Sequence, residues 1–380
     1  MDMYPGIGEI KISGFKSIRE LTLPLGRLNV LIGANGAGKS NFINVFLLLD
    51  AMTSKRLGRY VLERGGADSL LFYGRDVTKE LKIAFTFGDN KRPAQPGASA
   101  DFTGFESYHY MCALKPDDND SLFFDVEHCP VFEGGTIRSL MGAGKEMQLA
   151  EWTNTSPVAR DIWRNLRDIK VFHFQDTSES APMKKSSALL INNVVLRPDC
   201  ENIAAFLYFL KKNNEKDYQR IVSVIKMAAP FFADFSFGDV SENTRNVRLE
   251  WQDINSAKYF NANTLSDGTL RFICLATLLL QPKPPSIIIL DEPELGLHPA
   301  AITLLAEMLE SASQKSQIIV STQSVTLINN FEPENIIVTE RELKTGASVF
   351  KRLDREKTEQ WLEDYSLGEV WEKNIIGGRP

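Results

Sequence analysis

The sequence is poor in the residues that build disulfide frameworks and zinc sites. Its 380 residues include only four cysteines and four histidines. The cysteines are Cys112, Cys129, Cys200 and Cys274. None of them belongs to a Cys-x-x-Cys pair, the spacing that is typical of redox-active disulfides and of zinc ribbons. We therefore expect neither a disulfide scaffold nor a zinc ribbon.

Long apolar runs and an excess of positive charge are also absent. The longest apolar run, 272–280, has about half of the ~20 residues that a transmembrane helix needs. Polar residues and a proline interrupt the N-terminus, so that no signal peptide is expected there. The 43 Lys and Arg residues are outnumbered by 49 Asp and Glu, which gives a formal net charge of −6. We expect a soluble cytoplasmic protein in which any contact with nucleic acid is a local basic patch.

Apolar periodicity predicts an α/β chain. Short strands are expected within the first 32 residues, and the last of them, 28–32, is apolar throughout, as in a strand buried on both faces. Segment 176–190 has no clear periodicity and is expected to be a loop. Strands are expected at 80–87, 107–114, 121–127, 170–174, 235–240, 246–251, 287–290, 317–321, 335–339 and 347–351. Helices are expected over 201–229, 267–281 and 299–312, with helical turns from 356 to 373.

Residues 33–40, Gly-Ala-Asn-Gly-Ala-Gly-Lys-Ser, match the P-loop pattern. Its glycines allow a tight backbone whose N–H groups point at phosphate oxygens, and the helix that follows adds the positive end of its dipole. Lys39 would reach the β- and γ-phosphates, and Ser40 would ligate Mg²⁺. The expected nucleotide contacts are Asn35, Gly36, Ala37, Gly38, Lys39, Ser40 and Asn41.

Residues 286–292, Ser-Ile-Ile-Ile-Leu-Asp-Glu, predict a buried strand that ends in two acids. Open α/β sheets bind ligands at this end of their strands. Asp291 fits the carboxylate that holds Mg²⁺ through water, and Glu292 fits the group that positions and polarises the attacking water. The alternative for the pair is a solvated acidic turn.

Residues 265–269, Leu-Ser-Asp-Gly-Thr, precede an apolar helix. They offer a hydroxyl, a flexible glycine and a helix N-terminus, which together make a second anion site at Ser266 and Gly268. Taken alone, Ser-Asp-Gly is an ordinary helix cap. A second phosphate-binding helix in one protein need not face the P-loop of its own chain.

The order of these motifs, followed by Ile-Leu-Asp-Glu-Pro-Glu-Leu-Gly-Leu-His-Pro at 289–299 and Ser-Thr-Gln-Ser at 321–324, resembles the RecF, SMC and OLD ATPases. These are AAA family ATPases with ABC-type heads and no transporter partner, and the similarity is greatest to compact forms without coiled-coil arms. The resemblance implies an α/β P-loop NTPase fold with a mixed central sheet, an antiparallel β-subdomain and a helical second lobe. Lobe I would comprise 1–175 and 282–380, and lobe II 176–281.

The resemblance also implies a homodimer with two ATP molecules between the heads, each with Mg²⁺. The P-loop of one copy would hold each nucleotide, and Ser266 and Gly268 of the other copy would cap its γ-phosphate. Gln175 stands where such heads carry a glutamine that links the Mg²⁺ state to lobe movement. The loop of Glu294 to His298 would cross to the other copy, although His298 fits a helix N-cap before Pro299 equally well.

Gln323 stands at the switch position, where many ABC heads carry a histidine that touches the γ-phosphate. A glutamine can hydrogen-bond but cannot hold a proton as an imidazolium does. We therefore expect slow turnover and a long-lived closed state.

Two groups of charged residues lie outside these motifs, and for both of them exposure to solvent is the favoured interpretation. Lys55, Arg56, Arg59 and Arg64 follow the P-loop helix. A solvated face is favoured for this cluster over a contact with nucleic acid. Asp118 and Asp120 are spaced like metal-binding acids, but their polar surroundings favour a solvated loop.

Two functions remain open on this basis. The first is an ATP-hydrolysing dimer that acts on or senses DNA in repair or antiviral defence. The second is a nucleotide-gated scaffold that controls a separate effector, such as a nuclease or toxin encoded nearby, because no nuclease constellation follows the ATPase core. In both, contacts to the γ-phosphate would order an interface that is lost after hydrolysis.

Overall fold

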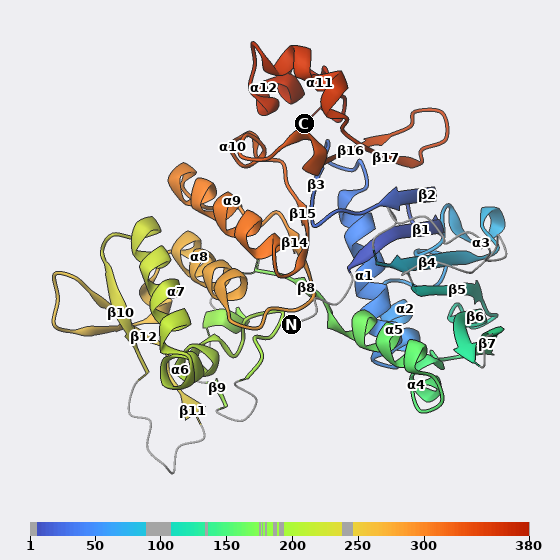
Figure 1. Cartoon of the computed structure of the whole chain (residues 1–380), viewed down its shortest axis with the longest axis horizontal. Helices are drawn as coiled ribbons and strands as arrows, with labels where there is room; N and C mark the ends of the chain where they lie inside the picture. Colours follow the sequence, from blue (N-terminus) through green and yellow to red (C-terminus); the bar gives the residue numbers. More distant parts are fainter. Residues whose placement is uncertain are drawn as a thin grey trace.

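The computed structural model describes residues 6–88, 108–133, 136–174, 176, 178, 181–184, 188–189, 194–237 and 246–379. Two six-stranded sheets form its body, and a region of helices and short strands lies beside them (Figure 1). Within the described part of the chain, no helix has the length and apolar character needed to cross a membrane.

The central sheet is mainly parallel and has the strand order β17-β16-β3-β15-β14-β8. Its strands are β3 (Leu28–Ile32), β8 (Ile169–Phe172), β14 (Ile287–Asp291), β15 (Gln317–Ser321), β16 (Ile336–Arg341) and β17 (Ser348–Arg352). Only β17 is antiparallel to its neighbour. Asp291 pairs with Ser321, which pairs with Leu31, so that the P-loop strand and the acidic strand end at the same edge.

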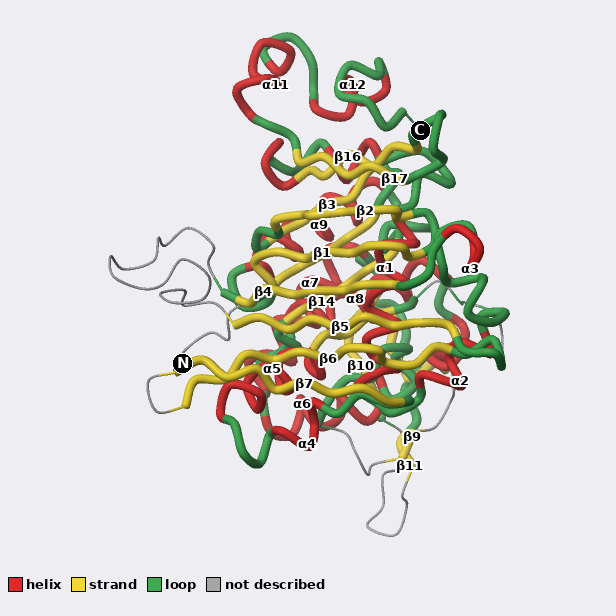
Figure 2. The backbone as a smooth tube through the Cα atoms, turned by 90° about the vertical axis from the view of Figure 1, so that its right-hand side faces the viewer, coloured by secondary structure: helices red, strands yellow, loops and turns green. Residues whose placement is uncertain are grey.

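The second sheet is antiparallel and has the order β2-β1-β4-β5-β6-β7, seen face-on in Figure 2. Its strands are β1 (Ile7–Phe15), β2 (Ile18–Pro24), β4 (Leu81–Phe87), β5 (Tyr108–Pro116), β6 (Leu122–Glu133) and β7 (Thr136–Gly144). Alternate residues of β4 are buried, as in a strand with one face on a core. The mixed central sheet and this antiparallel subdomain confirm the predicted fold class.

The faces of β14 separate two hydrophobic cores. Ile287 and Ile289 belong to one core together with Phe42 of α1 (Lys39–Thr53). Ile288 and Leu290 belong to the other, together with α8 (Asp267–Leu280). Because successive side chains of a strand point to opposite faces, α1 and α8 lie on opposite sides of the parallel sheet (Figure 1).

The remaining helices cover these cores. On the side of α1 lie α2 (Leu57–Glu63), α4 (Leu149–Trp152) and α5 (Pro157–Asp168). The short α3 (Gly74–Val77) has no buried residue and lies at the edge of the antiparallel sheet (Figure 1). On the side of α8 lie α6 (Ile203–Asn213), α7 (Glu215–Ala228) and α9 (Pro299–Ser313). α10 (Val325–Ile328) follows β15, and α11 (Arg355–Leu362) and α12 (Leu367–Glu372) follow β17. The lobe boundaries at 175 and 281 stay a prediction.

Several sequence-based expectations were wrong in detail. The segment expected as a loop, 176–190, contains a 3₁₀ turn (Pro182–Lys184) and β9 (Ala188–Leu189) within its described residues. The strand expected at 246–251 is divided between β11 (Asn246–Val247), which pairs with β9, and β12 (Glu250–Asp253). β12 lies between β10 (Phe232–Ser236) and β13 (Tyr259–Asn261). Short paired strands have too few residues to show an alternating pattern.

The antiparallel sheet is tied to α4 by a buried glutamate. Glu127 accepts hydrogen bonds from the Tyr110 hydroxyl (3.0 Å) and from the backbone N–H groups of Gln148 (2.7 Å) and Leu149 (3.1 Å). Gln148 occupies the N-cap position of α4 and Leu149 is the first residue of this helix, so that the carboxylate of Glu127 lies at a helix N-terminus.

Removal of this carboxylate is expected to destabilise the protein. Glu127→Ala leaves two buried donors and one part-buried donor unpaired and is expected to lower the free energy of unfolding by about 3 kcal/mol. Urea unfolding of the variant measures this. The exposed Glu20 of β2 gives the matched control, since Glu20→Ala removes a glutamate without this burial. Equal midpoints for the two variants would contradict the prediction.

Candidate active site

The loop between β3 and α1 needs glycine for two different reasons. Gly36 has a φ of 78°, and a side chain there would meet no atom within 4 Å, so that this face of the loop is open. Gly38 has a φ of 119°, and its Cβ would lie 2.1 Å from Ser348 Oγ of β17. Asn35, Gly36 and Ser40 are exposed, whereas Ala37, Gly38 and Lys39 are buried. The loop therefore presents a backbone that a phosphate can approach.

The Lys39 ammonium folds back over this loop. It donates to the carbonyls of Gly33 (2.5 Å) and Ala34 (3.2 Å). Burial lowers the pKa of Lys39, and the negative charges of Glu292, Asp291 and Glu294 oppose that effect. The ammonium thus lies within electrostatic reach of the acidic end of β14.

A chain of hydroxyls anchors the loop to β17. Ser348 Oγ donates to Ser17 Oγ (2.7 Å) or to the Ala37 carbonyl (2.6 Å), and the Asn41 side chain donates to Ser17 Oγ (2.7 Å). Ser17 and Ser348 are both buried. Sequence reasoning missed these serines, because no local pattern connects residues 311 positions apart.

The structure brings Asp291, Glu292 and Gln323 together at the ends of β14 and β15. The Ser321 hydroxyl donates to Asp291, and the Gln323 side-chain amide donates to Glu292 Oε1. Glu292 has a φ of 45°, and its N–H donates to the Ser321 carbonyl (2.9 Å). A non-glycine residue in this left-handed conformation requires support from its surroundings.

The N-terminus of α8 is open to solvent. Ser266 caps the helix by accepting the N–H of Thr269 (3.2 Å), and it is exposed. A Cβ at Gly268 would lie 2.4 Å from the carbonyl oxygen of Gly296, in the loop that follows the two acids. Gln175, the remaining predicted site residue, lies outside the described residues.

The comparisons with known proteins agree with this geometry. A family described as "AAA domain, putative AbiEii toxin, Type IV TA system" matches residues 28–130 and 155–329. The chain belongs to this family. It is a P-loop ATPase of the group that includes the OLD, SMC and ABC proteins, as the resemblance implied.

Among curated relatives, the OLD nuclease of Thermus scotoductus is 23% identical over 388 residues, which cover 94% of this chain and 67% of the nuclease. A putative ABC transporter ATP-binding protein of Methanosarcina acetivorans is 32% identical over 118 residues, 29% of this chain and 42% of the relative. The Smc head bound to the C-winged helix domain of ScpA has a TM-score of 0.61 at 17% identity, with 94% of this chain and 100% of that chain covered. This structural likeness supports the ABC-type head fold.

His173, which sequence reasoning did not place in the site of this AAA-domain chain, lies near Asp291. Burial lowers the pKa of His173, the charge of Asp291 opposes this, and the charge of Arg64 lowers the pKa further. His173 is therefore within electrostatic reach of the acidic strand end, and Arg64 is within electrostatic reach of His173. The motif Phe-Gln-Asp at 174–176 predicted that functional residues follow β8, but it did not identify His173 as one of them.

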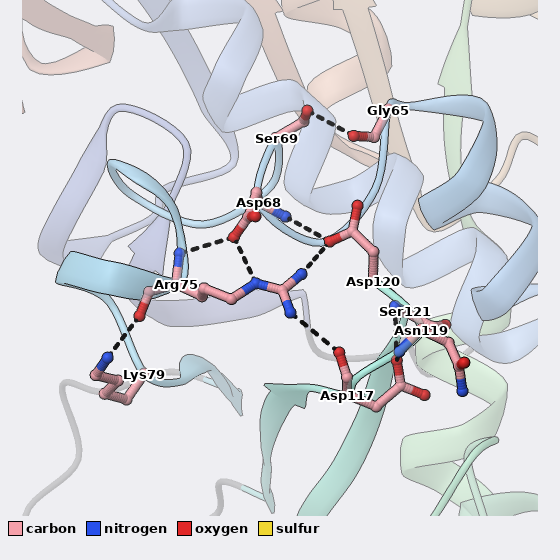
Figure 3. Close-up of polar contacts among 9 residues, drawn as sticks. All are labelled: Gly65, Asp68, Ser69, Arg75, Lys79, Asp117, Asn119, Asp120 and Ser121. Atoms are coloured by element: carbon pink, nitrogen blue, oxygen red, sulfur yellow. Dashed lines mark hydrogen bonds and ion pairs between the residues drawn. The ribbon is translucent and has the colours of Figure 1, made fainter.

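The segment that carries Arg64 is held against the β5–β6 turn (Figure 3). The Arg75 guanidinium pairs with Asp120 and donates to Asp68 Oδ1 (2.9 Å) and the Asp117 carbonyl (3.2 Å). A Cβ at Gly66 would lie 1.7 Å from Asp120 Oδ2, so that the two segments touch at this glycine. Asp120 remains partly exposed in this turn, with Arg75 as its ion-pair partner, which agrees with the expectation of a solvated loop.

The basic residues after α1 mostly have acidic neighbours. Lys55 lies 3.8 Å from Glu151, Arg56 lies 3.0 Å from Asp50, and Arg59 lies 2.7 Å from Glu63. The guanidinium of Arg64 lies over the ring of Tyr60 at 5.2 Å. These exposed pairs favour the solvated-face interpretation, since surface ion pairs exchange readily with water.

His298 has the geometry of a helix cap. Its Nδ1 accepts the N–H of Ala300 (3.3 Å), and Pro299 is the first residue of α9. The side chain is exposed, which leaves the expectation that this loop crosses to a second copy as a prediction.

The oxygen groups at this edge of the sheet fit Mg²⁺. Ser40 is exposed in the first turn of α1, and Asp291 ends β14, so that a hydroxyl and a carboxylate are available. The described residues contain no cluster of three or more His, Cys, Asp or Glu side chains that could hold a metal. The hydroxyl of Ser40 and the carboxylate of Asp291 suit Mg²⁺, which binds through one or two protein groups together with phosphates and water.

Proposed function

We propose that this ATPase works as a homodimer that holds two ATP molecules between its heads and hydrolyses them slowly. The observation that supports this is the placement of α1 and α8 on opposite faces of β14. The exposed cap of α8 at Ser266 would then bind the nucleotide of the other copy, because helix N-termini attract phosphate. A two-fold dimer would make both composite sites equivalent.

The P-loop residues take the roles expected from their types. Backbone N–H groups of 35–41 would bind the phosphates, and the Lys39 ammonium would neutralise charge on the β- and γ-phosphates. Ser40, Asp291 and Gln175 would hold Mg²⁺, which supplies further neutralisation of phosphate charge when it is bound. The hydrogen bonds from the Lys39 ammonium to the carbonyls of its own loop support this role, because they hold the ammonium against the loop.

Glu292 would position and polarise the attacking water, and Gln323 would hold Glu292 in place. The contact between the Gln323 amide and Glu292 Oε1 supports this pairing. Because Gln323 cannot carry a positive charge to the γ-phosphate, we expect slow turnover. A steady-state rate above a few per second without any partner would contradict this expectation.

Mixing two defective variants tests the composite site. Lys39→Ala removes the P-loop ammonium, and Ser266→Arg blocks the α8 cap at an exposed position that tolerates a large side chain in the isolated head. Each variant alone should lack activity, whereas an equal mixture should recover about a quarter of the wild-type rate, since half of its dimers contain one intact site of two. Recovery of no activity, with both variants folded and a mixed dimer formed in Mg-ATP, would contradict the sandwich.

We further propose a role in DNA repair or antiviral defence. The similarity to the OLD nuclease and the family description, which names a putative toxin of a type IV toxin–antitoxin system, support this choice. Stimulation of ATP hydrolysis by duplex DNA or DNA ends would support direct action on DNA. The basic side chains near Arg56 and Arg59 would be the contact.

The alternative is a nucleotide-gated scaffold that controls a separate nuclease or toxin. The match covers 67% of the length of the OLD nuclease, so that about a third of that nuclease lies outside the match. Stable co-purification with the product of a neighbouring gene, at an unchanged rate of ATP hydrolysis, would favour this alternative over direct action on DNA.

A further inference from the structure

The turn after the two acids buries a charged residue and exposes an apolar one. Glu294 is 8% exposed, whereas the next residue, Leu295, is 51% exposed. The opposite arrangement would bury more apolar surface and would leave the carboxylate in water. Burial of Glu294 in place of Leu295 lowers the stability of this turn, which indicates that the buried carboxylate has a function.

The Glu294 carboxylate is directed at the loop after β15. Its Oε1 accepts hydrogen bonds from the Thr322 hydroxyl and from the Gln323 backbone N–H (3.3 Å). Thr322 is fully buried, and its Oγ1 also accepts the Ser324 N–H (2.9 Å). Within the described residues, Glu294 Oε2 is buried and has no hydrogen-bond partner. The carboxylate therefore makes its hydrogen bonds to this one loop.

These contacts lead to the proposed catalytic group. The backbone of Gln323 is held by Glu294, and the side chain of Gln323 holds Glu292. The backbone of Glu292 is held separately by the Ser321 carbonyl. Glu292 is thus held by Ser321 at the end of β15 and by Gln323 in the loop that follows. Glu294 in turn holds the backbone of Gln323.

The same turn touches the α8 cap. The Leu297 N–H donates to the Glu294 carbonyl (3.0 Å), which closes a turn that contains Gly296. The Gly296 carbonyl oxygen lies where a Cβ on Gly268 would collide with it. Glu294 therefore belongs to a rigid turn that contacts both the loop of Gln323 and the helix of Ser266.

We infer that Glu294 is a positioning residue for ATP hydrolysis: it holds the loop of Thr322 and Gln323, and through Gln323 it orients Glu292. This inference rests on the proposed role of Glu292. Glu294 acts through another residue and need not touch the nucleotide. Its loss should therefore slow the chemical step without weakening the binding of ATP.

Steady-state kinetics of the full chain test this role. Glu294→Ala is expected to lower kcat by roughly 10-fold or more while KM for ATP changes by less than about threefold. Glu294→Gln keeps an oxygen that can accept both hydrogen bonds, and it should retain kcat within about threefold of wild type. Glu307, an exposed glutamate on α9, supplies the matched control Glu307→Ala, with unchanged kcat.

A double-mutant cycle separates positioning from a general loss of structure. In a Gln323→Ala background, Glu294→Ala should lower kcat no further, because the two residues act in series. The same loss in both backgrounds would overturn the inference, as would a Glu294→Gln variant that is as slow as Glu294→Ala. If Glu294→Ala does not fold, Thr322→Val decides: a lowered kcat at unchanged KM supports the inference, and a wild-type kcat overturns it.

The kinetics of Glu292→Gln distinguish a failure of the proposed function from a failure of the inference about Glu294. Wild-type turnover by Glu292→Gln would overturn the proposed function and this inference together. An inactive Glu292→Gln variant combined with wild-type kinetics of Glu294→Ala would overturn this inference alone.

Discussion

Replacement of Glu292 by glutamine is expected to lower steady-state ATP hydrolysis roughly 100-fold or more while ATP binding is retained. Glu292 ends the acidic strand in a left-handed conformation, with its carboxylate held by the Gln323 amide. A glutamine of the same size would fill this place but could not polarise the attacking water. Phosphate release measures the rate, and nucleotide titration measures the retained affinity.

The same variant should accumulate as a dimer in Mg-ATP. Blocked hydrolysis keeps the γ-phosphate in place, and the γ-phosphate is what would join the P-loop of one copy to Ser266 of the other. Light scattering with and without Mg-ATP reports the change in mass. A variant that stays monomeric in Mg-ATP, with no other oligomer surface found, would refute the sandwich, and Glu307→Gln on exposed α9 is the control.

Lys39→Ala is expected to abolish nucleotide binding, with a rise in Kd for ATP of about 100-fold or more. The buried ammonium lies against the loop carbonyls of Gly33 and Ala34, within reach of the phosphates. Alanine removes this positive charge and leaves the negative charges of Asp291, Glu292 and Glu294 to repel the nucleotide.

Calorimetric titration with ATP measures the loss of affinity, and thermal unfolding without nucleotide checks the fold. Lys283→Ala gives the matched control, because Lys283 is exposed and precedes β14 without belonging to the site. Wild-type affinity of Lys39→Ala would show that the nucleotide binds elsewhere. Loss of affinity by both variants would point to a general charge effect.

Local patterns were sufficient to predict the elements that carry the chemistry. The strand expected at 28–32 is β3, the strand expected at 317–321 is β15, and α8 begins beside the cap predicted at Ser266. Each of these segments has an apolar pattern with a clear stop or cap within a few residues. The spacing of apolar residues in such a segment depends only on which of its faces is buried, and this spacing can be read from a single sequence.

Elements with weaker patterns were missed. β7 contains three residues with small or no side chains near its end, which weakens its pattern. α5 was missed although Ala159, Ile162 and Leu166 form a buried apolar stripe along it. The start of α5 had a readable signal, because Ser156 caps the helix and Pro157 is its first residue. The short strands β9 and β11 form by pairing with each other across 57 or more positions of the chain. No local pattern in either segment predicts this pairing.

The sequence by itself determined the P-loop strand and helix, the acidic strand end and the helix cap, because short apolar and glycine patterns specify them. Only the tertiary structure decided that Ser348 supports Ala37, that Glu294 holds Thr322, and that α1 and α8 lie on opposite faces of β14. The physical reason is strand order: β3 lies between β15 and β16, which are about 300 positions later in the chain. Hydrophobic burial marks a face as inward, but the partner that covers it depends on how the whole sheet is assembled.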